Sequence, residues 1–267
     1  IESLNGNIVV DGNNLQLASL KSVNGSTATT AKNAIKDGNG SAVNIIATRW
    51  QADAVNGIGS GLGDAASADA IETNVDVLSV RNAGSLGSAQ QSNINITNNK
   101  ALKIEQLANN GDISISNLGD IVLDNTNNSY FNPTNNDARA QGGVINSGAD
   151  SVSGGQLLLT ITGGMVRAEN VADAKNPDII ANIATFKYNS SFDFGERNRK
   201  IVMQIPEVYN QNARLSFVKW YEGIKPKVMN DLSKVPSDSI ISGRDQLIQI
   251  EGLSEIDPAI FTNLRNY

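Results

Sequence analysis

The chain contains no cysteine and no histidine in its 267 residues. Without cysteine it forms no disulfide framework and offers no thiolate nucleophile or metal ligand. Without histidine it cannot build a Ser-His-Asp or Cys-His catalytic site, and ordinary histidine-containing zinc or iron sites are excluded as well. Any chemistry would have to rest on carboxylates, lysine, arginine or tyrosine, and we expect no cofactor.

Basic clusters and long apolar runs are also missing. The net charge is −6 and the pI is near 4.8, whereas nucleic acids and anionic membranes are bound by clustered Lys and Arg, so we expect no nucleic-acid partner. No run approaches the ~18 apolar residues that predict a transmembrane segment. The first residues, Ile1 to Leu4, do not resemble a signal peptide, and strand-like sequence follows at once. We therefore expect a fragment whose secretion signal lies upstream.

What is abundant is glycine and asparagine. The sequence has 24 glycines but only 6 prolines, and aromatic residues make up 5%. Asn and Gly tolerate positive φ, so Asn-Gly pairs are strong turn signals. Such pairs occur at Asn5-Gly6, Asn24-Gly25, Asn39-Gly40, Asn56-Gly57 and Asn110-Gly111. This composition indicates many short strands separated by turns.

A repeat of 19 residues runs through the stretch from Asn74 to Asp124. Its members are pairs of apolar residues that alternate with polar ones, the pattern of a strand. The pairs are Val75/Val77, Ile94/Ile96 and Ile113/Ile115 in one register (94 − 75 = 19; 113 − 94 = 19), and Leu102/Ile104 and Ile121/Leu123 in another (121 − 102 = 19).

Polar residues keep the same spacing. Asn74, Asn93 and Asp112 fall in one column, and Asn98 falls over Asn117, where stacked amides can form hydrogen bonds from turn to turn. A fixed period near 20 residues that carries several strands is typical of a solenoid. At ~3.3 Å per residue one period has a contour of ~60 Å, which suits one turn of a parallel β-helix. We predict an all-β fold, with a parallel β-helix over residues 1–185.

These coils resemble the filamentous-haemagglutinin family of large bacterial exoproteins. The resemblance covers roughly residues 1–170, and its residues are Gly57-Ile58-Gly59-Ser60, Ile71 to Leu78, Ile94-Asn95-Ile96, Gly111 to Ile115 and Gly119 to Leu123. It implies a right-handed helix and export through an outer-membrane two-partner secretion transporter. The N-terminal secretion domain of the family, the C-terminal cysteine pair of some adhesins and any toxin module are missing.

The apolar alternation lapses between about residues 125 and 155, and we predict an irregular loop there. It carries one aromatic pair, Tyr130-Phe131. An exposed aromatic on a loop can stack on a sugar ring, although the pair can equally pin the loop to the shaft.

Composition shifts near residue 185, where most aromatics, Lys and Arg begin. We predict a small α+β or β-rich module over residues 186–267, with strands that are antiparallel and helices at Ile224 to Val235 and after Asp257-Pro258. A further short helix is expected at Thr27 to Lys36. Since a solenoid needs its last coil covered, the module is expected to act as a cap.

Glu105 and Asp124 lie one period apart (124 − 105 = 19). They would stack ~5 Å apart, and could share a cation such as calcium. Polysaccharide-degrading enzymes with β-helical folds use carboxylates on adjacent coils, so the pair is also the candidate for catalysis. The simpler interpretation is two acids that turn outward into water, because no third acid or Arg joins the column.

Three other features have a structural and a functional interpretation. Asp112 and Asp120 follow glycine and are expected to bond backbone amides at turns rather than calcium. The charged run Glu196 to Lys200 is expected at a hairpin tip. Trp220, beside Tyr221, could form a sugar platform but is more typical of a core position.

The sequence therefore predicts a non-enzymatic, secreted or surface-displayed bacterial adhesin that attaches to host cells, matrix or other bacteria, a virulence trait. Its receptor would be a glycan or a protein. A β-helical polysaccharide lyase or glycoside hydrolase, and a structural shaft without a ligand, are the alternatives.

Overall fold

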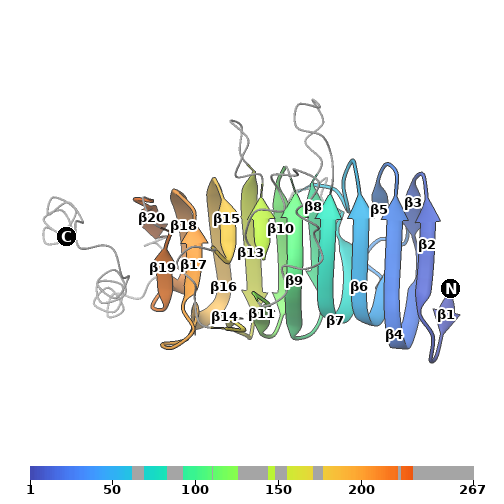
Figure 1. Ribbon diagram of the computed structural model, residues 1–267, viewed down its shortest axis with the longest axis horizontal. Helices are drawn as coiled ribbons and strands as arrows, with labels where there is room; N and C mark the ends of the chain where they lie inside the picture. The colour runs from blue at the N-terminus through green and yellow to red at the C-terminus, as the bar shows by residue number, and fades with distance from the viewer. Residues whose placement is uncertain are drawn as a thin grey trace, which may run out of the picture.

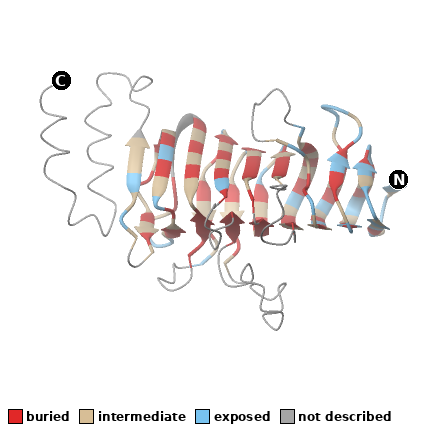
Figure 2. Cartoon of the chain, turned by 90° about the horizontal axis from the view of Figure 1, so that it is seen from above, coloured by how far each residue is buried: buried red, intermediate tan, exposed pale blue. Residues whose placement is uncertain are grey.

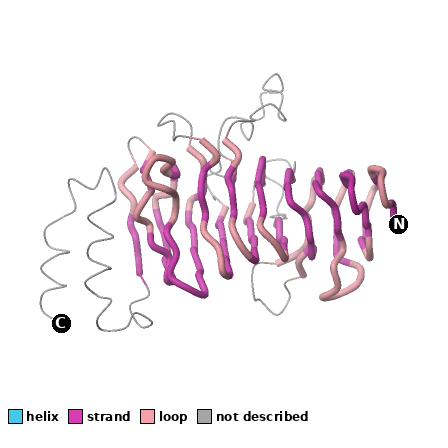
Figure 3. Tube along the Cα trace, turned by 90° about the horizontal axis from the view of Figure 1, so that it is seen from below, coloured by secondary structure: helices cyan, strands magenta, loops and turns pink. Residues whose placement is uncertain are grey.

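The computed structural model describes residues 1–61, 69–82, 93–109, 111–125, 144–147, 155–170, 177–221 and 224–230. Every regular element in these ranges is a β-strand (Figures 1 and 3). No helix long and apolar enough to cross a membrane occurs in them. The strands are β1 (Glu2–Ser3), β2 (Ile8–Gly12), β3 (Leu15–Leu17), β4 (Leu20–Ala31), β5 (Ile35–Asp37), β6 (Ile45–Ala54), β7 (Ile71–Asn82), β8 (Ile94–Asn98), β9 (Leu102–Asn109), β10 (Ile113–Leu118), β11 (Ile121–Leu123), β12 (Ile145–Ser147), β13 (Gln156–Thr162), β14 (Val166–Ala168), β15 (Ile179–Ala181), β16 (Ile183–Asp193), β17 (Ile201–Gln204), β18 (Glu207–Arg214), β19 (Val218–Trp220) and β20 (Lys227–Asn230).

Named strands pair with one another in parallel, and they follow one another along the long axis of the molecule (Figure 1). One series, here called row A, runs β1, β4, β6, β7, β8, β10, β13, β16, β18, β20. A second series, row B, runs β2, β4, β6, β7, β9, β12, β15, β17, β19. The long strands β4, β6 and β7 belong to both rows and thereby join the two rows into one curled sheet.

The predicted period is confirmed in part of the chain. Ile94 pairs with Ile113, and Leu102 pairs with Ile121, both at the expected offset of 19 residues. The amide of Asn98 donates to Asn117 Oδ1 at 3.0 Å, so the predicted asparagine ladder is also confirmed.

The register predicted between β7 and β8 is wrong. Ile96 lies opposite Ile71 rather than opposite Val77, and Asn98 lies opposite Thr73, an offset of 98 − 73 = 25 residues. Asn98 Oδ1 accepts from the Thr73 hydroxyl and from the backbone amide of Val75, both at 3.0 Å. This buried hydrogen bonding fixes the register six residues away from the expected one, so Asn74 does not stack on Asn93.

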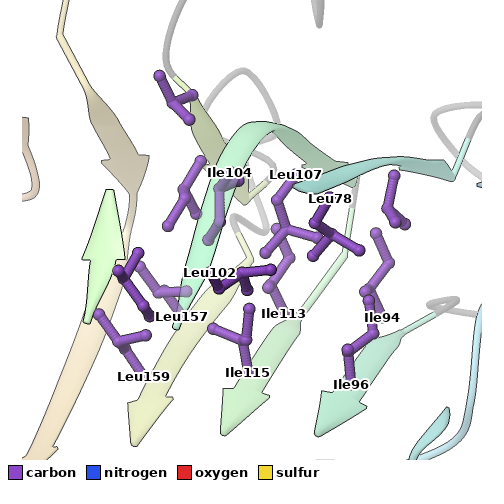
Figure 4. Packing of buried hydrophobic residues seen from close by; sticks show 14 of the residues in the cluster. Leu78, Ile94, Ile96, Leu102, Ile104, Leu107, Ile113, Ile115, Leu157 and Leu159 are labelled. Atoms are coloured by element: carbon purple, nitrogen blue, oxygen red, sulfur yellow. The ribbon is translucent and has the colours of Figure 1, made fainter. Parts of the chain in front are cut away.

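Inward-facing side chains of neighbouring strands lie in register and form a continuous apolar core. Figure 2 shows the buried positions along the strands, and Figure 4 shows the packing inside. Two core lines on β8, β10 and β13 are Ile94, Ile113, Leu157 and Ile96, Ile115, Leu159. Each fully buried side chain of this kind stabilises the fold by roughly 1.5–3 kcal/mol.

The parallel rows continue beyond residue 185. β16 spans the predicted boundary, and its inward side chains Ala184, Phe186 and Tyr188 lie next to Leu157, Leu159 and Ile161 of β13. The prediction of antiparallel strands here is wrong, since β16–β18, β17–β19 and β18–β20 are all parallel. Local alternation identifies a strand but carries no information on the direction of its partner.

Other expected elements also differ. The predicted helix at Thr27 to Lys36 is wrong, because residues 27–31 lie in β4 and residues 35–36 in β5, with Thr27 and Thr29 buried. Of Ile224 to Val235, residues 227–230 form β20 instead of a helix. The segment predicted as a loop contains β12, paired with β9 and β15. Residues 126–143, 148–154 and 231–267, including the helix predicted after Asp257-Pro258, lie outside the described part.

Candidate functional site

Glu105 lies on β9 and Asp124 directly follows the neighbouring strand β11, but the two acids contact different cations. Leu123 pairs with Ile104, which places the two acids next to one another in sequence register. Glu105 accepts from Arg49 through both carboxylate oxygens, Nη1 to Oε1 at 2.8 Å and Nη2 to Oε2. Asp124 Oδ2 lies 3.0 Å from Lys103 Nζ. The side chains are only 8% and 2% exposed, so the interpretation as two acids turned into water is wrong.

A β-bulge accounts for the orientation of Glu105. Leu78 pairs with Ile104 and Ser79 with Gln106, which leaves Glu105 as the extra residue. A bulge re-aims the side chain that it carries. The sequence pattern did not reveal Arg49, because it is 56 residues from Glu105. The two residues meet across β6, β7 and β9, and the offsets between these strands differ from the 19-residue period.

The charges around Lys103 form a network that crosses several strands. Lys103 Nζ lies 3.6 Å from Glu169, and the hydrogen bond that Lys103 donates to Asp124 is the main cause that raises the pKa of Lys103. Arg199 donates to the Glu169 carbonyl at 3.2 Å and pairs with Glu196 at 3.2 Å. Each acid in this network lies within ion-pair distance of Lys103 or Arg199, an arrangement that holds neighbouring strands together.

The turn aspartates behave as predicted. Asp112 Oδ1 accepts from the backbone amide of Gln156 at 2.8 Å, and Asp120 Oδ1 accepts from that of Met165 at 3.1 Å. Both bonds join consecutive turns of the chain. The charged run lies at a tight turn, as expected, because Glu196 and Arg199 exchange backbone hydrogen bonds as an antiparallel bridge.

Two acids have strongly raised pKa values. Burial raises the pKa of Asp178 to about 6, against the opposing hydrogen bonds from the Val202 amide and the Asn125 side chain. Burial also raises the pKa of Glu72 to about 7, with smaller contributions from the charges of Asp37 and Asp69. Within the described ranges no group of three acidic residues is arranged to hold a metal ion.

The aromatic candidates are not exposed where the structure describes them. Trp220 is 7% exposed in β19, which agrees with a core position rather than a sugar platform. Tyr130 and Phe131 lie outside the described residues.

One exposed aromatic was overlooked. Tyr209 in β18 is 40% exposed and is the single aromatic side chain among the large hydrophobics exposed in the described chain. Its hydroxyl donates to Glu207 Oε1 at 2.5 Å, and this hydrogen bond raises its pKa. Its neighbours Val208 and Asn210 are buried, which turns Tyr209 outward. Because Asn210 is polar, no alternation of apolar and polar residues in the sequence marks this side of the strand.

Comparisons with family models, with curated proteins and with solved structures give no match to this chain. Its function is therefore inferred from the placement of its own residues.

Proposed function

We propose that this chain is a shaft segment of a secreted or surface-displayed bacterial exoprotein, a parallel β-helix that acts as an adhesin. The observation that carries the proposal is the in-register parallel stacking of rows A and B along one axis. In such a stack the backbone hydrogen bonds run along the axis, which makes a stiff rod suited to holding a binding surface away from a cell.

Cross-strand polar bonds support the same role. The asparagine pair Asn98–Asn117 and the ion pair Arg49–Glu105 join different turns of the chain on the inside and on the flank. A rod built from repeated contacts between neighbouring turns can also fold one turn at a time, which is consistent with export through a partner pore. The coil pattern that resembles filamentous haemagglutinins supports the two-partner route.

Retention on cell surfaces tests the adhesin proposal. Fluorescently labelled chain is incubated with intact bacteria, epithelial cells and immobilised matrix, and the heat-unfolded chain serves as control. We expect the folded chain to be retained on at least one surface in a saturable manner, with competition by unlabelled protein. Equal retention of folded and unfolded chain, or none on any surface, would contradict the adhesin proposal and favour the ligand-free shaft.

The length of polysaccharides after incubation with the chain tests the alternative that the chain is an enzyme. Size-exclusion chromatography of bacterial and host polysaccharides after incubation with the chain would reveal shortened products. Shortening that is lost in Glu105→Gln or Asp124→Asn would overturn the adhesin proposal. We expect intact polysaccharides, because both carboxylates are occupied by Arg49 and Lys103.

A further inference from the structure

The outward side chains of β13, β16, β18 and β20 form one face, here called the Tyr209 face. Successive residues of a strand point to opposite sides, and the intervening residues, such as Leu157, Leu159, Phe186 and Val208, are buried. The parallel register places the outward residues in three lines across the strands: Gln156–Ile183–Glu207–Lys227, Leu158–Thr185–Tyr209–Met229 and Thr160–Lys187–Gln211.

The middle line is the apolar part of this face. Tyr209 is its most open member, and Leu158, Thr185 and Met229 are half-buried on either side. The hydrogen bond from the Tyr209 hydroxyl to Glu207 fixes one end of the side chain. A ring that is exposed and already oriented loses little conformational freedom when a flat apolar ligand surface packs on it.

The flanking lines carry cations that the described residues leave unpaired. Lys187 and Lys227 take part in none of the ion pairs of the described chain, in contrast to Lys21, Lys100 and Lys103. Glu207 is the one acid of the three lines, and it accepts the Tyr209 hydrogen bond. On a chain of net charge −6, the Tyr209 face is locally positive.

We propose that the Tyr209 face binds an acidic polysaccharide, one whose sugar rings carry carboxylates. A pyranose ring packs its C–H face on Tyr209, Lys187 and Lys227 attract carboxylates on either side, and Thr160 and Gln211 offer hydrogen bonds to hydroxyls. Neighbouring strands are ~4.8 Å apart and outward positions on one strand are about 7 Å apart, so the face extends beyond a single ring. The inference rests on the proposed adhesin function, for which it names the receptor class and the site.

Binding of three acidic polysaccharides, polygalacturonate, alginate and hyaluronate, to the full chain tests this proposal. Affinity electrophoresis or biolayer interferometry at low salt gives the apparent Kd, and the methyl-esterified polymers are the controls for charge. We expect at least one acid polymer to bind and its ester to bind roughly tenfold more weakly, with affinity falling as salt rises.

Variants locate the site. Tyr209→Ala is expected to weaken binding roughly tenfold, whereas Tyr209→Phe keeps the ring and most of the affinity. Lys187→Gln and Lys227→Gln are expected to weaken binding several-fold, while Lys36→Gln, an exposed lysine on β5, leaves it unchanged. Unfolding midpoints of all variants establish that the loss is local.

The outcomes separate this inference from the adhesin proposal. If none of the three polymers binds, if the esters bind as well as the acids, or if Tyr209→Ala binds like the parent chain, the Tyr209 face is not the site. Retention on cells that persists in Tyr209→Ala would then keep the adhesin proposal while the glycan inference fails.

Discussion

At the scale of single residues, the bond between Arg49 and Glu105 joins strands that are distant in sequence. The Glu105 side chain is 8% exposed, so removal of the guanidinium leaves a nearly buried carboxylate without its main partner. We expect Arg49→Met to lower the free energy of unfolding by about 2–3 kcal/mol, measured by urea denaturation. Lys21→Met, which breaks an exposed pair with Glu2, is the matched control and should change little. Equal effects of the two substitutions would show that burial of Glu105 has no energetic consequence.

Asp178 predicts a pH dependence of stability. Asp178 is 2% exposed, and burial holds its folded pKa at about 6, above the ordinary value of 3.8. Because the folded state binds the proton more tightly, this group favours the folded state below about pH 4, and that stability is lost as pH rises through about 6. We expect Asp178→Asn to be more favourable, relative to the parent chain, at pH 7.5 than at pH 4.5, by on the order of 2 kcal/mol. Urea midpoints at both pH values measure this difference. The contribution of Glu72 to the pH dependence cancels, because both proteins contain Glu72. A substitution effect that is the same at both pH values would contradict the displaced pKa.

Residue roles were predictable from sequence only where they depend on local neighbours. Asp112 and Asp120 follow turn glycines, and their bonds to backbone amides were correctly predicted. The partner of Glu105 was not, because it depends on unequal spacings between strands and on one bulge. The exposure of Tyr209 was not predictable either, because the buried position next to it is the polar Asn210, which breaks the alternation of apolar residues along the strand.

At the scale of strands and turns, two adjacent glycines test how closely the chain packs between turns. A Cβ on Gly164 would lie 2.0 Å from the Gly119 carbonyl carbon, whereas one on Gly163 would meet nothing within 4 Å. Gly163 has a φ of +70°, so Gly163→Ala is expected to cost only the ~1 kcal/mol of a left-handed alanine. Gly164→Ala must push β14 away from β11, and we expect a clearly larger fall in the thermal midpoint. A smaller effect at Gly164 than at Gly163 would mean that the turn adjusts freely.

Element prediction from the sequence succeeded where spacing is regular and failed where it is not. The offset of 19 residues between β8 and β10 needs no information beyond the alternation of isoleucines. Between β10 and β13 the offset is 157 − 113 = 44, and between β7 and β8 it is 25, so a fixed period cannot locate these partners. The direction of pairing at β16 and β18 failed for a similar reason, since strand direction is set by the whole row and not by local sequence.

At the scale of the whole molecule, contacts run mainly between neighbouring turns, and stability should therefore vary along the axis. Among the described strands β2 pairs with β4 alone, whereas β10 lies between β8 and β13. In a stack with nearest-neighbour coupling an end strand opens by breaking one interface, while an inner strand must break two. We expect amide hydrogen exchange, followed by mass spectrometry, to be faster in peptides of β2 than in those of β10. Ile8→Ala, which removes a core side chain of β2, should speed exchange in β2 and leave β10 unchanged. Equal protection of β2 and β10, or loss of protection in both strands in Ile8→Ala, would instead show that the entire stack opens as one cooperative unit.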